Sequence, residues 1–68
     1  ELKDYSLLTF NQVCRRTSLS RTTLWRLTRT GRFPSPINIA GIRKAFVAQE
    51  VDDWIVARMS ERDIDVQH

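Results

Sequence analysis

The arginine and hydroxyl side chains of residues 20–32 have the types and the spacing to bind a polyanion. This segment, SRTTLWRLTRTGR, holds four arginines, five Ser or Thr residues and no acid. An arginine guanidinium can bind a phosphate or a guanine edge through two parallel hydrogen bonds, whereas a lysine acts as a point charge. A helix that only packs in a core needs far less charge, so we interpret this segment as a helix presented to an anionic partner.

The distribution of charge along the chain favours the same interpretation. Residues 1–47 carry nine Lys or Arg and two acids, a balance of +7; residues 48–68 carry two Arg and six acids, a balance of −4; the net charge is +3. No acid lies between Tyr5 and Val47, and nine of the eleven basic residues are Arg. This division predicts that one part of the molecule faces an anion. A solvated basic surface with no partner is the alternative.

The composition bounds the class of protein. A chain of 68 residues forms one domain, and a hydrophobic content of 41% is enough for a compact fold. The single cysteine, Cys14, cannot form an internal disulfide, so we expect a reducing cytoplasm and no metal or other cofactor. No apolar run approaches the roughly 20 residues of a membrane span, so we expect no membrane partner. No nucleophile–base arrangement or Gly-rich phosphate loop predicts an enzyme.

A capping box predicts the start of a first helix. Thr9 and Gln12 have the spacing of this motif, in which each side chain accepts a hydrogen bond from the backbone of the other residue. Phe10, Val13 and Cys14 then recur on one helical face, which predicts a helix over about 10–16. A helix this short is not stable alone, so it must pack against the rest of the chain.

A second helix is predicted over about 21–30. Ser20 is its N-cap candidate, and Gly31 has the conformational freedom that the residue after a helix end requires. Residues 17–19 alone separate this helix from the first one. Two short helices joined by so tight a turn are typical of a helix-turn-helix.

A β-hairpin is predicted next, because the sequence PSP excludes a continued helix. Residues 37–39 alternate apolar and polar side chains, Ala40-Gly41 can form a tight turn, and residues 43–47 supply a second strand. Counting by twos places Lys44 and Phe46 on the same face of that strand. Periodicity alone therefore does not explain how Phe46 is buried while Lys44 stays in water.

A third helix is predicted over about 49–62, with a core stripe of Val51, Trp54 and Ile55. Acids near its start and arginines near its end match the helix dipole, and the tail after Asp63 is expected to fray. The order helix, helix, hairpin, helix defines a mainly α fold with a small β-hairpin, which is a helix-turn-helix plus a wing. We expect residues 1–68 to form one domain, ordered over about 7–62.

Helical spacing also indicates which side of residues 21–30 turns outward. At 100° per residue, Leu24, Leu27 and Ser20 fall on the buried side. Thr22, Arg26 and Arg29 fall nearly opposite the buried side, and Arg21 lies on the flank between the two sides. Because a helix fits the major groove of B-DNA, where Arg binds guanine and a Thr methyl contacts thymine, this face predicts duplex DNA as the partner. We expect Trp25, on the flank, to pack against the hairpin or the first helix.

Other basic residues have a structural explanation beside a binding one. Arg15 and Arg16 end the first helix and Arg32 follows the second, where each can complement a helix dipole or contact a phosphate. Arg43 and Lys44 follow the hairpin turn. They can reach a backbone phosphate or a minor groove, but basic residues also protect edge strands against aggregation.

Three stretches, TSLSRTTLWRL, GRFPSPI and EVDDWIVAR, resemble the AlpA family of small phage and prophage regulators, relatives of the excisionase and MerR-type winged-helix domains. The resemblance covers about residues 7–62. It implies a DNA-binding regulator that acts near an integrase gene or as an excision factor. By position, it places Ser20, Arg21, Thr22, Arg26 and Arg29 on the recognition helix, and Arg43 and Lys44 in the wing.

The sequence departs from the family pattern in two places. The wing of these proteins commonly carries a glycine-flanked Arg, and a Trp before the third helix, where this chain has Ile42-Arg43-Lys44 and Phe46. Trp25 stands where a Tyr is usual, which is compatible with packing. These departures leave the register of the wing open.

Three functions compete. The leading interpretation is a sequence-specific transcriptional regulator of phage or prophage type in the bacterial cytoplasm, with residues 21–30 in the major groove of duplex DNA and residues 37–47 as wing. An excisionase-like architectural factor that bends DNA for an integrase shares this fold and face, so the sequence does not separate the two. An adaptor that binds an acidic protein is the third. An integrase and further copies of the chain on repeated sites are candidate partners.

Overall fold

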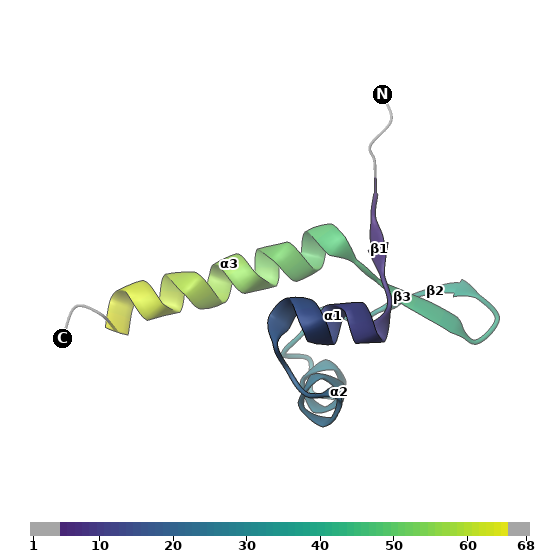
Figure 1. Ribbon diagram of the computed structural model, residues 1–68, viewed down its shortest axis with the longest axis horizontal. Coiled ribbons are helices and arrows are strands. Elements are labelled where there is room, and N and C mark those ends of the chain that lie inside the picture. The colour runs from purple at the N-terminus through teal and green to yellow at the C-terminus, as the bar shows by residue number, and fades with distance from the viewer. Residues whose placement is uncertain (1–4, 66–68) are drawn as a thin grey trace.

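The computed structural model describes residues 5–65, with side chains described through residue 62. In this range it has three helices and a three-stranded antiparallel sheet (Figure 1). In chain order the elements are β1 (Leu7–Leu8), α1 (Phe10–Thr17), α2 (Arg21–Arg29), β2 (Ile37–Ala40), β3 (Arg43–Val47) and α3 (Ala48–Asp65). The predicted fold class, a helix-turn-helix with a hairpin wing, is confirmed.

Both predicted N-caps are present. The Thr9 backbone N–H donates to Gln12 Oε1 at 2.8 Å, and the Gln12 backbone N–H donates to Thr9 Oγ1 at 3.1 Å, which completes the capping box before α1. Ser20 Oγ accepts from the Thr23 backbone N–H at 3.1 Å before α2. Between the helices, Ser18 adopts a left-handed conformation with φ of 63°. Local hydrogen bonds thus fix the helix-turn-helix.

The end of α2 also follows the sequence prediction. Gly31 has φ of 78°, and its N–H donates to the Thr28 carbonyl at 3.3 Å, while the Arg32 N–H donates to the Leu27 carbonyl at 2.9 Å. These two bonds form a Schellman motif, which turns the chain back at a helix end. The reversal brings the next segment, residues 33–36, back across the core toward the sheet.

The sheet has the order β1-β3-β2, with β3 in the centre. The predicted hairpin is confirmed, since β2 pairs with β3 through Ile37↔Ala45 and Asn38↔Lys44. β1 was not predicted, because two residues are too few to show an alternating pattern. Its Leu8 pairs with Phe46 and so supports the base of the hairpin. An isolated two-stranded hairpin is at best marginally stable in water, so this support matters.

The hairpin turn lies one residue later than predicted. Ala40 pairs with Arg43, so the two loop residues are Gly41 and Ile42 rather than Ala40 and Gly41. Gly41 has φ of 58°, and a glycine with positive φ at the first loop position is what a type II′ hairpin requires. The shift places Ile42 at the tip, where its side chain is 98% exposed.

The core lies where the three helices meet the base of β3. Its buried residues are Val13, Leu24, Phe33, Phe46 and Val51, with Trp54 and Ile55 packed against them. Phe33 was not predicted as a core residue, since it follows α2 in an irregular segment without periodicity. The Phe33 ring centroid lies 5.8 Å from that of Phe46 and 4.8 Å from that of Trp54. Trp54 Nε1 also donates to the Arg32 carbonyl at 2.9 Å, which joins α3 to this segment.

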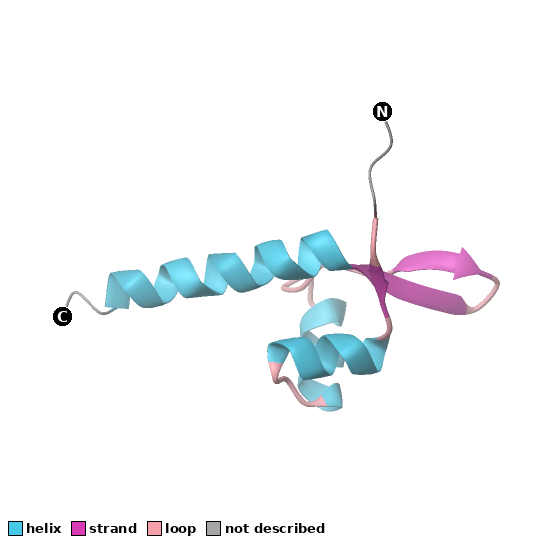
Figure 2. Cartoon of the chain, turned by 45° about the horizontal axis from the view of Figure 1, so that its top comes forward, coloured by secondary structure: helices cyan, strands magenta, loops and turns pink. Residues whose placement is uncertain are grey.

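The position of the hairpin explains why Phe46 is buried and Lys44 exposed on one strand face. Phe46 lies at the base of β3, opposite β1, and is 3% exposed. Lys44 lies two residues nearer the tip, where the hairpin extends beyond the helices and its side chain is exposed (Figure 2). The same face is thus buried at one end and solvated at the other.

α3 is longer than expected. It begins at Ala48 and continues to Asp65, three residues past the predicted end, and its C-terminal half extends beyond α1 (Figure 1). No apolar periodicity marks these added residues, so the sequence did not indicate them. The rest of the tail that was expected to fray, residues 66–68, lies outside the described residues. Among the described helices, none is long and apolar enough to cross a membrane.

Candidate nucleic-acid interface

α2 and the hairpin present basic side chains without acidic neighbours in sequence. Five of these side chains are exposed, namely Arg21, Arg26, Arg29, Arg43 and Lys44, and Arg32, which follows α2, is exposed as well. Among the side chains that the structure describes, no carboxylate forms an ion pair with any of the six. Their positive charge is therefore not neutralised within the fold, and its field is directed at the solvent.

The faces of α2 follow the predicted helical spacing, with one difference. Leu24 is fully buried and Leu27 is half-buried, whereas the predicted binding residues of the helix, Arg21, Thr22, Arg26 and Arg29, are all exposed. Ser20 was placed on the buried side by its angle, but it is exposed, because as N-cap it precedes the helix and its side chain turns to the backbone. The exposed arc therefore includes the N-terminus of α2.

Trp25 is more exposed than the sequence analysis expected. Its side chain was expected to pack against the hairpin or α1, and it is 54% exposed. The expectation depended on the need of a small core for aromatic area, but Phe33, Phe46 and Trp54 supply that area. Trp25 lies 100° from Leu24 on the helix, which is midway between the buried and outward sides. That angle was the available signal that Trp25 is a candidate site residue.

Two arginines of α2 are oriented by aromatic rings. Arg21 Cζ lies 4.9 Å from the ring centroid of Phe10, and its guanidinium donates to the Asn11 side chain. Arg29 Cζ lies 4.5 Å from the ring centroid of Trp25, which is one turn earlier on the helix. Each is a cation–π contact. The guanidinium groups at both ends of the exposed face are thus partly preorganised.

The three other arginines that were predicted as possible phosphate contacts differ in whether they have a partner within the fold. Arg16 Nη1 lies 2.7 Å from Asp52 Oδ1, so this residue joins α1 to α3 in an ion pair. Arg15 is exposed beside it on α1. Arg32 is exposed after α2, and its carbonyl accepts the hydrogen bond from Trp54. Arg16 therefore has a structural partner, whereas the side chains of Arg15 and Arg32 are directed at the solvent.

The structure also determines the wing register that the sequence left open. Asn38 faces Lys44 and Ala40 faces Arg43, with an irregularity between Asn38 and Ala40. Both basic residues are exposed on the distal part of β3. Ile42 at the tip, which was not among the predicted site residues, is a second site candidate. An apolar residue beside a glycine in a predicted turn was the signal for it.

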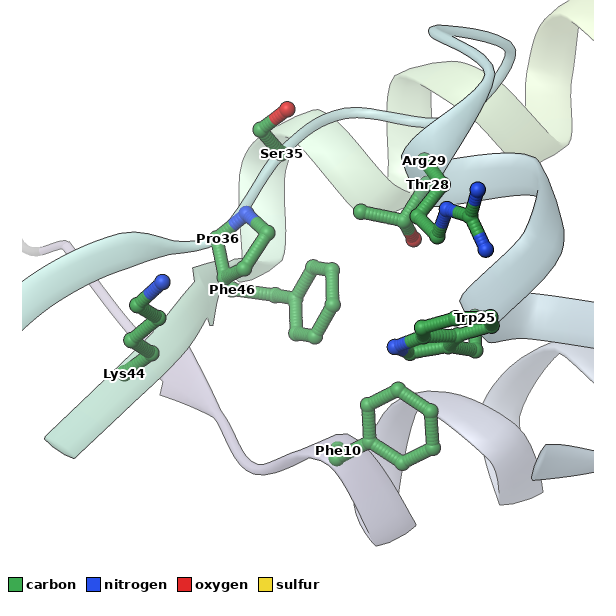
Figure 3. Close-up of a pocket in the computed structure, with 8 residues that line it drawn as sticks. All are labelled: Phe10, Trp25, Thr28, Arg29, Ser35, Pro36, Lys44 and Phe46. Carbon is green, nitrogen blue, oxygen red and sulfur yellow. The ribbon is translucent and has the colours of Figure 1, made fainter. Parts of the chain in front are cut away.

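A cleft of about 430 Å³ lies between α2 and the hairpin (Figure 3). Its lining residues are Phe10, Trp25, Thr28, Arg29, Ser35, Pro36, Lys44 and Phe46. Arg29 belongs to the helix and Lys44 to the hairpin, so the cleft is bordered by a cation on each side. The predicted recognition helix and wing therefore flank one hollow of the surface.

A helix-turn-helix followed by a basic hairpin defines a winged-helix domain. The family model described as the prophage CP4-57 regulatory protein (AlpA) matches residues 6–59, which is most of the chain. The chain therefore belongs to the AlpA family of prophage regulatory proteins, as its sequence motifs predicted.

A relative in Enterobacteria phage P4, the uncharacterized protein ORF88, is 36% identical over 44 residues. This match covers 65% of the present chain and 50% of the phage protein, so the chain spans about half the length of that relative. No solved structure shows a significant match to the chain.

Proposed function

We propose that this chain is a duplex-DNA-binding regulator of phage or prophage transcription, with α2 in the major groove and the β2–β3 hairpin as its wing. One observation carries the proposal. α2 and the hairpin flank a single cleft and carry exposed basic side chains that no described carboxylate pairs with. Membership in a family of prophage regulators supports it.

The exposed residues divide by the part of the duplex that they would contact. Thr22 and Arg26 lie on the outward side of α2, where a helix in the major groove meets base edges. Arg29, near the end of α2, lines the cleft toward the hairpin and would contact a backbone phosphate. Ser20 and Arg21 lie at the N-terminus of α2, where free backbone N–H groups favour a phosphate. Arg43 and Lys44 would contact backbone phosphates or the adjacent minor groove. Phosphate contacts position the protein, and base contacts provide specificity.

Selection from a pool of randomised duplexes at ~150 mM salt tests this function, since affinities without a stated salt concentration are uninterpretable. We expect recovery of duplexes that share a motif, and loss of that enrichment in Arg26→Ala. Arg58→Ala is the matched control, because it removes the same charge from α3, where Arg58 is paired with Glu61. Failure to recover any duplex would refute DNA binding and leave an acidic protein as the partner of the basic face.

The wing tip favours a second candidate function, an architectural factor that bends DNA for an integrase. Ile42 is 98% exposed between Gly41 and Arg43, and proteins that kink DNA from the minor groove insert apolar side chains such as Ile between base steps. A circular-permutation assay measures the bend. We expect Ile42→Ser to reduce the bend more than the affinity; an unbent complex of the unmodified chain would exclude this function and retain the regulator. Integrase binding and cooperative binding of several copies remain part of this second proposal.

A further inference from the structure

The exposure of Trp25 is not explained by the fold. Trp25 lies among the basic residues of the exposed arc of α2 and is 54% exposed, although four other large aromatic residues belong to the core or pack against it. Trp25 also separates two hollows of the surface. One is the 430 Å³ cleft toward the hairpin, and the other is a shallower hollow lined by Phe10, Arg21, Thr22 and Trp25. Its position is that of a contact residue.

The lining of the cleft matches a ligand that has an anionic group attached to an apolar group. Its floor consists of the rings of Phe10, Trp25, Pro36 and Phe46, with Lys44 on the hairpin side and Arg29 beside the indole (Figure 3). No lining residue is acidic. A cationic ligand would be repelled by Arg29 and Lys44. A purely apolar ligand would remove both charges from water without a partner, which is costly.

The location of the cleft selects one source for such an anion. A duplex that holds α2 in its major groove and the hairpin in the adjacent minor groove must pass one backbone strand between these two elements. The surface between them is this cleft. A nucleotide unit of that strand has an apolar deoxyribose and an anionic phosphate, which match the floor and the two cations.

We propose that the cleft between α2 and the hairpin binds one sugar–phosphate unit of the duplex backbone. The deoxyribose packs on Trp25 and Pro36, which line the cleft and keep part of their surface exposed, and the phosphate lies between Arg29 and Lys44. The cation–π contact of 4.5 Å between Arg29 and Trp25 holds the guanidinium at the edge of the cleft floor. These two residues of α2 therefore contact both parts of the nucleotide, Trp25 the sugar and Arg29 the phosphate. This inference rests on the proposed function, since it names the part of the DNA that this cleft contacts.

Affinity measurements with two variants test the proposal. Lys44→Gln removes one phosphate contact, so the slope of log K against log salt should become less negative by about 0.9, with equal loss for all duplex sequences. Trp25→Ala should weaken binding by about tenfold, which is what burying roughly 60 Å² of apolar surface provides. Both residues are exposed, so we expect both variants to fold. Tyr5→Ala is the matched aromatic control, because Tyr5 is 68% exposed and precedes β1.

A spectroscopic experiment reports on the indole directly. Addition of duplex to the unmodified chain should change the tryptophan fluorescence and protect it from iodide quenching, and Trp25→Phe should abolish both effects. The cleft proposal would be overturned, and DNA binding left intact, by the following result. The duplex binds without changing the fluorescence or its quenching, and Lys44→Gln and Trp25→Ala bind the duplex with the affinity of the unmodified chain. Absence of any duplex binding would instead overturn the proposed function.

Titration with thymidine 5′-monophosphate distinguishes a free nucleotide from the duplex backbone. We expect no saturable fluorescence change up to millimolar nucleotide, because an isolated unit lacks the contacts of α2 with the rest of the duplex. Saturable micromolar binding that is lost in Lys44→Gln would overturn the assignment to the backbone and make the cleft a small-ligand site.

Discussion

The salt dependence of binding can be estimated from the exposed charges. α2 and the hairpin present five basic side chains on their exposed surfaces, namely Arg21, Arg26, Arg29, Arg43 and Lys44. If each neutralises the charge of one phosphate, whether it lies against the backbone or, as Arg26 does in the proposed complex, in the major groove, the slope of log K against log salt is about −0.9 × 5, or roughly −4.5. The affinity should then fall about 500-fold between 50 and 200 mM salt. A sixth contact from Arg32 would steepen the slope by about 0.9.

Substitution of one wing residue refines this estimate. Arg43→Gln should change the slope from roughly −4.5 to about −3.6 and weaken specific and random duplexes by the same factor, because a phosphate contact carries no sequence information. The assay is fluorescence anisotropy of a labelled duplex at several salt concentrations. Arg58→Gln on α3 should leave the slope unchanged, since it removes an equal charge outside the α2 and hairpin surface.

A nearly flat salt dependence would refute the reasoning as a whole, because a polyanion cannot bind this surface without releasing counterions. A slope near −4.5 that Arg43→Gln and Arg58→Gln reduce equally would refute only the placement of the contacts. In that case the net charge of the chain, and not the hairpin, would determine the affinity.

Three further predictions concern stability. Phe33→Ala removes the ring of a residue that is 97% buried, at a cost of about 3–5 kcal/mol in the free energy of unfolding. A core this small provides roughly 3–5 kcal/mol of stability in total, so circular dichroism at 25 °C should show an unfolded chain. A cooperative thermal transition would contradict this prediction. A double-mutant cycle of Arg16→Ala and Asp52→Ala should give a coupling free energy below about 1 kcal/mol, because both side chains are exposed. A coupling free energy above about 2 kcal/mol would show that the pair does not behave as a surface ion pair. Gly41 has φ of 58°, a conformation that alanine rarely adopts, so Gly41→Ala should reduce the free energy of unfolding by about 1 kcal/mol and lower the melting temperature by several degrees. An unchanged melting temperature would show that the turn relaxes.

The sequence predicted those features that depend on neighbouring residues. The caps at Thr9 and Ser20 and the helix end at Gly31 are local, because each uses hydrogen bonds within four or five residues. β1 and the core position of Phe33 are not local. A two-residue strand has no period, and Phe33 is buried only because the chain reverses after α2 and α3 packs on it. Such contacts between distant segments leave no periodic pattern in the sequence.

The candidate site divides in the same way. The basic residues of α2 follow from composition and helical angle, and the structure exposes each of them. Trp25 and Ile42 required knowledge of what the core already contained and of where the hairpin turned. The expectation for Trp25 assumed that a small core must use every large ring, but Phe33 fills that role. The turn of the hairpin moved by one residue, which placed Ile42 at the tip.

Phe46 connects the stability of the domain to the geometry of its binding surface. Its ring lies 6.2 Å from that of Phe10 and 5.8 Å from that of Phe33, so it holds β3 against the helices. The same residue forms the floor of the cleft, and Lys44 lies two positions further along the strand. The distance between the cations of the hairpin and those of α2 therefore depends on a core side chain. Phe46→Leu keeps every basic residue and Trp25, and it should still lower duplex affinity, because the smaller side chain changes how the wing is held relative to the recognition helix.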